Sequence, residues 1–363
     1  MRITRLHSQV LRLPQARAVP LPMSGAGQGA ARSEPIALLV QIETDAGITG
    51  VGFGCFTISG RALLATIEEE LLSWLVGEDP LNHERSWARV QACANPLAIP
   101  AYAPVDIALW DIKAKQAGLP LWQLLGGVRD KVPIHAAETA DPSLFANDVI
   151  ALARSCLSRG LGGIRVGMRG QDPEADAQKV QEVRAALGED IWFAVTASGR
   201  YDYETALPMG RFIEEEVGAD WFEDPLQDGD LTGYTRLSSR IDTPLAAGSS
   251  FTRAEQFVRL IETGASVILR PDVLRVGGIT PWLKIAALAE LHYRPVVPYM
   301  LPEISVHLAC GLPGVQAVEH VPTLASLFTA QLQIENGQVV PPARPGHGWE
   351  INEEIVERYR IVK

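Results

Sequence analysis

Paired cysteines are the first feature that this sequence lacks. The chain has four cysteines, at positions 55, 93, 156 and 310, and none of them forms a CxxC pair. A zinc finger needs such pairs, so this class of fold is excluded. Cysteines scattered this widely along a chain of 363 residues predict a reduced protein of the cytoplasm.

Long apolar runs and basic clusters are also missing. No apolar segment reaches the roughly 18 residues of a membrane span, and the 32 lysines and arginines form no run. The net charge of -11 disfavours binding to nucleic acid or to an anionic membrane, so we expect neither as a partner. An anionic substrate would need a local cationic site, because the overall field of the protein repels it.

Apolar residues are plentiful, with 47% hydrophobic and 21% charged residues, and they support a large core. The first third reads as strands followed by helices. We expect one strand at 3–13 and two more within 36–52, on either side of a turn at 45–47. Helices are expected at 60–76, 80–94 and 105–118. The segment 14–35 is rich in Pro, Gly, Ser and Ala, and a loop of this length is either disordered or a functional lid.

From Lys131 onward, short apolar runs alternate with amphipathic helical segments. Repeated strand–helix units of this kind indicate a parallel sheet, and eight of them close into a (β/α)₈ barrel. The expected strands are 132–137, 163–168, 191–195, 219–222, 244–247, 266–269, 295–297 and 315–318.

Polar residues follow these strands at intervals of 27, 31, 27, 26, 23, 27 and 20 residues, which is about one strand plus one helix each time. The carboxyl ends of barrel strands converge on one mouth, where barrel enzymes bind their substrates. We therefore expect the following side chains to gather there: Glu138, Arg165, Thr196, Glu223, Ser249, Asp272, Tyr299 and Glu319.

The strand-end segments resemble the mandelate racemase/muconate lactonizing enzyme group of the enolase superfamily. The matching stretches are ALWDIKAKQAGLPLWQLLGG (108–127), FEDP (222–225), AAGSS (246–250), RPDVLRVGGIT (270–280) and PGHGWEIN (345–352). The resemblance implies an α+β capping domain over the barrel mouth. It gives a cap at 1–128 with a lid at 14–35, a barrel at 129–335, and a C-terminal segment at 336–363 that returns to the cap.

In that family, three acidic residues at the ends of strands three, four and five hold one Mg²⁺. The resemblance places Thr196, Glu223 and Ser249 at these positions, so only one acid is retained. Asp224 is adjacent, but the alternation of side chains along a strand turns it to the opposite face. Mg²⁺ requires hard anionic oxygens. The sequence therefore predicts no Mg²⁺, or a weakly bound ion.

The family's bases are a Lys-x-Lys on strand two and an Asp/His dyad on strands six and seven. Here the lysine positions hold Arg165 and Gly167, and the dyad reads Asp272 and Tyr299. Arg270 lies two residues before Asp272 and so faces the same side. One hypothesis is that Arg165 and Arg270 replace the metal charge beside Glu223. The alternative is that each arginine is only a structural ion-pair partner.

Three functions remain open. The first is an isomerase or lyase that acts on a small carboxylate, such as an acid sugar or hydroxy acid, as part of an expected homo-oligomer. Its catalytic residues would be Asp272, Tyr299, Glu319 and Arg165. The second function is an inactive pseudoenzyme or carboxylate-binding protein, and the third is metal-free lactone or ester chemistry. The expected substrate-binding residues are Arg270, Arg165, Met23 and Glu138.

Overall fold

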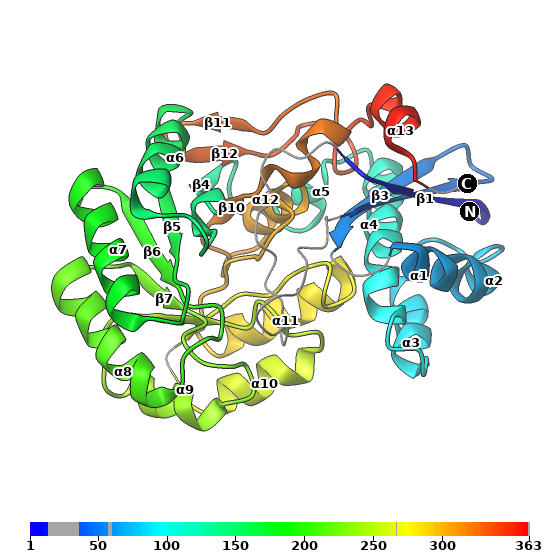
Figure 1. Ribbon diagram of the computed structural model, residues 1–363. Helices are drawn as coiled ribbons and strands as arrows, with labels where there is room; N and C mark the ends of the chain where they lie inside the picture. Colours follow the sequence, from blue (N-terminus) through cyan, green and yellow to red (C-terminus); the bar gives the residue numbers. More distant parts are fainter. Residues whose placement is uncertain (14–35, 57–59, 266, 362–363) are drawn as a thin grey trace.

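The computed structural model describes residues 1–13, 36–56, 60–265 and 267–361. The predicted lid at 14–35, and Met23 within it, therefore lie outside the described residues. The cap and the barrel lie side by side, with the barrel helices at the left of Figure 1 and the cap at the right. All four cysteines are free. Among the described residues, no helix combines the length and the apolar character that a membrane span requires.

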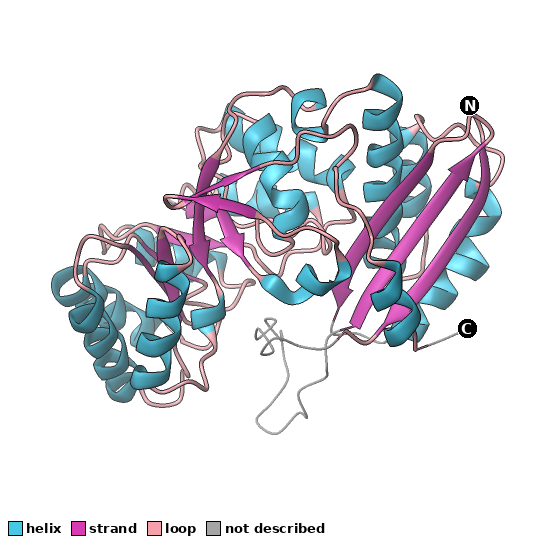
Figure 2. Cartoon of the chain, turned by 90° about the horizontal axis from the view of Figure 1, so that it is seen from above, coloured by secondary structure: helices cyan, strands magenta, loops and turns pink. Residues whose placement is uncertain are grey.

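The cap is built on a three-stranded antiparallel sheet. Strands β1 (Ile3–Leu11), β2 (Ile36–Thr44) and β3 (Thr49–Phe56) pair in this order, and helices cover one face of the sheet (Figure 2). The two strands predicted within 36–52 are present. The cap helices are α1 (Gly60–Ala65), the π-helical η1 (Thr66–Leu71), α2 (Leu72–Leu75), α3 (His83–Ala92), α4 (Ala98–Ala117) and α5 (Leu121–Leu124).

Helix α4 starts earlier than the sequence predicts. The apolar pattern predicts a helix from Val105, the residue after Pro104, and proline removes a backbone hydrogen bond inside a helix. The structure instead begins the helix at Ala98 and keeps Pro104 inside it. Most residues of α4 are buried, and the packing of its apolar side chains outweighs the missing bond.

The close packing of β3 on α4 gives a first prediction. A Cβ atom at Gly52 would lie 1.7 Å from the backbone oxygen of Pro104, so no side chain fits there. Because the helix backbone must move, Gly52→Ala should lower the free energy of unfolding by about 1–3 kcal/mol in urea denaturation. Gly229→Ala is the control, since a Cβ there meets nothing within 4 Å. Equal stability of the two variants would contradict this packing.

The barrel strands are parallel and follow the chain order. They are β4 (Val132–Ala136), β5 (Gly163–Gly167), β6 (Trp192–Thr196), β7 (Trp221–Glu223), β8 (Leu245–Ala247), β9 (Val267–Leu269) and β10 (Val318–His320). The seventh of the eight predicted strands is reduced to bridges, since Val296 pairs with Leu269 and Val315. Strand β10 pairs with β4 and closes the barrel. The predicted fold is confirmed.

Helices alternate with these strands around the outside of the barrel (Figure 1). They are α6 (Ala146–Ser158), α7 (Pro173–Leu187), α8 (Tyr203–Phe212) with η3 (Ile213–Val217), α9 (Leu231–Ser238), α10 (Ala254–Glu262), α11 (Ile279–Leu291) and α12 (Pro302–Gly311). Helix α12 is short and fully buried. It directly follows the reduced seventh strand, so its first turn lies at the barrel mouth.

The C-terminal segment contacts both parts of the molecule. The expectation was that 336–363 returns to the cap. In the structure, β11 (Gln333–Glu335) and β12 (Gln338–Val340) form a hairpin, and β12 pairs with β4 of the barrel. The rest of the segment reaches the cap, where Gly346 bridges Pro120 and His347 bonds to Asp111 and Val51. Beyond α13 (Glu353–Tyr359), Arg360 bridges Leu11 at the end of β1. The hairpin pairs with Val132 and Pro133, which precede the residues of β4 that pair with β10 and β5.

Candidate functional site

Strained backbone marks the barrel mouth. The non-glycine residues with φ in the left-handed region, among those described, include Ser198 (50°), Asp224 (41°), Met300 (60°) and Leu301 (45°). The first two directly follow β6 and β7, and the other two follow the reduced seventh strand. This conformation costs about 1–2 kcal/mol per residue and typically persists at functional sites, where the surrounding structure enforces it.

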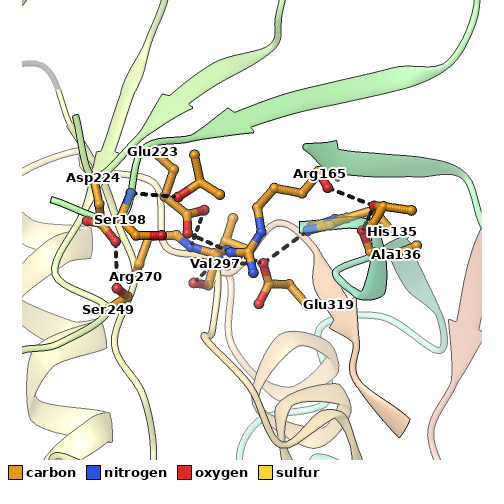
Figure 3. A network of polar contacts seen from close by, with 12 residues as sticks. His135, Ala136, Arg165, Ser198, Glu223, Asp224, Ser249, Arg270, Val297 and Glu319 are labelled. Atoms are coloured by element: carbon orange, nitrogen blue, oxygen red, sulfur yellow. Dashed lines mark hydrogen bonds and ion pairs between the residues drawn. The ribbon is translucent and has the colours of Figure 1, made fainter. Parts of the chain in front are cut away.

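Two arginines and two glutamates form a closed ion network at the mouth (Figure 3). Arg165 contacts Glu223 at 2.5 Å and Glu319 at 2.8 Å. Arg270 contacts Glu319 as well, and its Nε lies 3.4 Å from Glu223 Oε2. The four residues come from β5, from the ends of β7 and β9, and from β10, and each is at most 3% exposed. The predicted contact of both arginines with Glu223 is confirmed.

The charges in this network balance, with two guanidinium groups against two carboxylates. Burial raises the pKa of Glu319, but Arg165 and Arg270 outweigh it and hold that pKa well below its usual range. His135 lies 3.6 Å from Glu319, and burial lowers its pKa, so we treat it as neutral. The network therefore holds two guanidinium cations at the mouth, and its net charge is zero. Sequence analysis did not single out His135 as a member, because it is an interior residue of β4.

The network still has polar atoms without a hydrogen-bond partner. These buried atoms are Arg165 Nε, Arg270 Nε, Glu223 Oε2 and Glu319 Oε2, among the residues that the structure describes. Buried polar groups are normally hydrogen-bonded, and exceptions are typical of binding or catalytic sites. Arg270 Nε faces Glu223 Oε2 at 3.4 Å without hydrogen-bond geometry, whereas the Arg165 Nε–H has no acceptor among the described residues and suits a carboxylate oxygen.

Tyr299 packs against both arginines. Its ring centre lies 5.4 Å from each guanidinium carbon, which is within the range of cation–π contacts. Burial raises the pKa of Tyr299 above its ordinary value, and the opposing effect of Arg165 is smaller. The hydroxyl therefore stays protonated near neutral pH and is suited to donate a hydrogen bond or a proton, not to abstract one.

The remaining positions that the resemblance assigns to metal ligands are already hydrogen-bonded. Ser249 Oγ donates to Asp224 Oδ2 at 2.6 Å, and the Thr196 hydroxyl accepts from the Ser198 amide at 3.3 Å. Asp224 follows β7 with a left-handed φ of 41°, and its carboxylate bonds to Ser249 and is no member of the arginine–glutamate network. Within the described ranges, no cluster of three or more His, Cys, Asp or Glu is arranged to hold a metal ion.

Asp272 lies at the mouth but outside the ion network. Its Oδ1 accepts the Leu274 amide at 2.8 Å, and its Oδ2 lies 3.6 Å from Arg275. Burial raises the pKa of Asp272 to about 6, although Arg275 and backbone amides oppose the shift. Asp272 also lines a small hollow with Cys55 of the cap and with Glu303, a residue that sequence analysis did not identify. No signal in the sequence separates Glu303 from the apolar residues around it.

Glu138 belongs to a different cluster from the one predicted. Its carboxylate contacts His320 Nδ1 at 2.5 Å, Arg159 at 2.9 Å and Cys156 at 3.3 Å. Arg159 and His320 also line a cavity of about 300 Å³ between β10, α12 and the β11 edge. Glu138 is thus held by local partners and makes none of the contacts that define the ion network.

Comparisons with known proteins identify the family of both domains. Residues 8–126 match the mandelate racemase/muconate lactonizing enzyme N-terminal domain, and residues 148–355 match the enolase C-terminal domain-like family. The L-talarate/galactarate dehydratase of Salmonella typhimurium is 33% identical over 92% of this chain and 86% of the relative. The arabinonate dehydratase of Saccharolobus solfataricus is 30% identical over 88% and 89%.

Solved structures are similar over almost the whole chain. An L-talarate/galactarate dehydratase mutant, liganded with Mg and L-glucarate, superposes with a TM-score of 0.92 at 31% identity over 99% of this chain and 92% of the other. The L-talarate dehydratase of Polaromonas sp. JS666, complexed with Mg and L-glucarate, gives 0.88 at 32% identity over 99% and 98%. With both domains matched in sequence and in structure, the chain belongs to the mandelate racemase/muconate lactonizing enzyme family of the enolase superfamily.

Proposed function

We propose that this protein is an isomerase or lyase that acts on a small hydroxy carboxylate of the acid-sugar class without Mg²⁺ in the family position. The observation that carries this proposal is the closed network of Arg165, Glu223, Arg270 and Glu319. The relatives named above are dehydratases of acid sugars, which supports the substrate class and the reaction type. A homo-oligomer and a cytoplasmic location remain part of the proposal.

The residues at the metal positions do not fit a hard dication. Mg²⁺ requires octahedral oxygen ligands with compensating negative charge. Glu223 is the single acid in this set, and it faces a guanidinium group on each side. A dication next to Glu223 would have to displace these cations or be repelled by them. The arrangement therefore favours fixed guanidinium charge in place of the metal.

The side chains at the mouth have separate roles in substrate binding and proton transfer. The guanidinium groups of Arg165 and Arg270 bind the substrate carboxylate and stabilise the negative charge of an enediolate, which an N–H donor in a buried site does effectively. Asp272 abstracts the α-proton, since its pKa of about 6 leaves it ionised at neutral pH. Tyr299 donates a hydrogen bond, and Glu319 holds the two arginines in place.

Removal of metal should leave the activity intact. The purified protein should contain no stoichiometric Mg²⁺, and EDTA should not change the rate at which galactarate or D-galactonate exchanges its α-proton in D₂O. Elemental analysis and proton NMR measure the two quantities. Mg²⁺ bound in a one-to-one ratio and required for exchange would contradict the proposal.

The second candidate is an inactive carboxylate-binding protein. It is favoured by Arg165 and Gly167 at the positions that the resemblance gives to lysine bases, because arginine keeps its proton in proteins. Thermal stabilisation by galactarate without any proton exchange would support this candidate. Turnover of lactones or esters, again without metal, would instead support the third function considered from the sequence.

A further inference from the structure

Glu303 is a buried carboxyl group at the barrel mouth to which nothing above assigns a role. It is the second residue of α12, directly after the left-handed pair Met300 and Leu301 and Pro302. Its side chain is 3% exposed, and its Oε2 has no hydrogen-bond partner among the described residues. Its backbone oxygen accepts the Trp349 indole N–H at 2.7 Å, which fixes the start of the helix.

The hollow shared by Glu303 and Asp272 has the size of one water molecule. Its volume is about 20 Å³, and a cavity needs roughly 10–15 Å³ on this scale to hold a water, together with two to four polar partners. The two carboxyl groups supply such partners, and Thr323 and Cys55 lie in the same wall. The other lining residues are apolar, so a water in this hollow would bond to the carboxyl groups.

The two acids are matched in proton affinity. Burial raises the pKa of Glu303 to about 7 and that of Asp272 to about 6. A proton therefore moves between them at little cost in free energy, as efficient acid–base catalysis requires. Burial, reinforced by the charges of Glu303 and Asp272, raises the pKa of the Cys55 thiol to about 12, so the thiol stays protonated.

The other charged groups near Glu303 are compensated or neutral. On its cavity side lie Arg159 and His320, both of which pair with Glu138. On its own helix, His307 bonds to the backbone oxygen of residue 347, and burial lowers the pKa of His307 to about 3. The carboxyl group of Asp272 is therefore the acid–base partner that Glu303 faces across the small hollow.

We infer that Glu303 is a proton-relay group of this site, exchanging a proton with Asp272 through a water molecule in the hollow between them. The inference rests on the proposed function and names a residue that it did not include. Glu303 serves as the second acid–base group of the site. Tyr299 is unsuited to this role, because burial raises the pKa of Tyr299.

The step balances without a co-reactant. Asp272 takes the α-proton, and the electron pair of the broken C–H bond forms the enediolate. The Asp272 acid then gives a proton to the water, which passes one of its own protons to the Glu303 carboxylate, so Asp272 is regenerated. In elimination the proton returns by the same path to the leaving hydroxyl, which departs as water. Its return to the α-carbon restores the substrate, and this reversal is observed as exchange in D₂O.

Glu303→Gln and Glu303→Asp test the relay, with α-proton exchange of galactarate and D-galactonate in D₂O measured from pH 5 to 9. We expect Glu303→Gln to slow exchange by about 10- to 100-fold, within the usual range for one acid–base group. It should also remove the inflection near pH 7. Glu303→Asp should restore part of the rate, because it keeps a carboxyl group.

A stability measurement checks the titration without any substrate. The folded state holds the Glu303 proton up to about pH 7, while the unfolded chain releases it near 4.5. The free energy of unfolding of the wild type should therefore fall, relative to that of Glu303→Gln, as the pH rises from 4.5 to 7. Parallel curves for the two proteins would overturn the inference.

The experiments distinguish a failure of the relay from a failure of the proposed function. If the wild type exchanges the α-proton and Glu303→Gln keeps the same rate and pH profile, the relay is wrong and the proposed function stands. If the wild type exchanges no proton of either acid sugar, the proposed function is wrong and the relay falls with it.

Discussion

Arg270→Met should lower the free energy of unfolding by about 3–5 kcal/mol, because removing one partner of a buried ion pair leaves an uncompensated charge. Arg270 is fully buried and contacts both Glu223 and Glu319. Without it, one guanidinium group faces two carboxylates that are at most 2% exposed. Urea denaturation at pH 7 measures the change, read as a shift of the midpoint at constant slope.

An exposed ion pair provides the matched control. Arg344 and Glu350 form a contact in which the side chains are 65% and 62% exposed, and Arg344→Met should cost at most about 1 kcal/mol. The double variant Arg270→Met/Glu319→Leu should recover part of the loss, because both charges are removed together. A single Arg270→Met variant as stable as the control would show that the network is not closed as described.

Asp272→Asn should reduce α-proton exchange of galactarate by about 10²–10⁴-fold, the usual contribution of a positioned general base. The amide keeps the shape of the side chain but accepts no proton. In the wild type, the rate should rise as the pH increases through about 6, because burial places the pKa of Asp272 there and only its ionised form is a base. Proton NMR in D₂O follows the exchange directly.

Asp176→Asn is the control for this prediction. Asp176 is as buried as Asp272 and accepts hydrogen bonds from the Arg169 and Gly170 amides and from Tyr201, but it lies on α7 outside the barrel. Its replacement should lower stability and leave the exchange rate per folded molecule unchanged. Equal rates for Asp272→Asn and the wild type would remove Asp272 from the mechanism.

Fixed guanidinium charge and a bound metal differ in what they demand of the protein. The metal site of the family uses three carboxylates, whereas here Arg165 and Arg270 already balance Glu223 and Glu319. The replaced positions also form bonds of their own, since Ser249 donates to Asp224. The substitutions at strands two, three, five and seven fit the proposal that the site changed as a unit.

The sequence by itself determined the fold and the set of strand-end residues, because the period of the strand–helix units and the position of each polar residue after its strand are local properties. Those properties also placed Arg165 and Arg270 beside Glu223. The sequence did not determine which carboxylates the arginines pair with, since Glu319 is distant in the chain and becomes a neighbour only when β10 closes the barrel on β4.

Three further features were decided only by the tertiary structure. The left-handed φ of Asp224 depends on the surrounding fold, and the alternation of a strand does not predict it. The start of α4 depends on burial that outweighs the effect of Pro104. Glu303 acquires its proton affinity from the apolar walls around it, and these walls come from the cap, the seventh strand and the segment after β10. Burial is a property of the assembled fold, so no local pattern in the sequence encodes it.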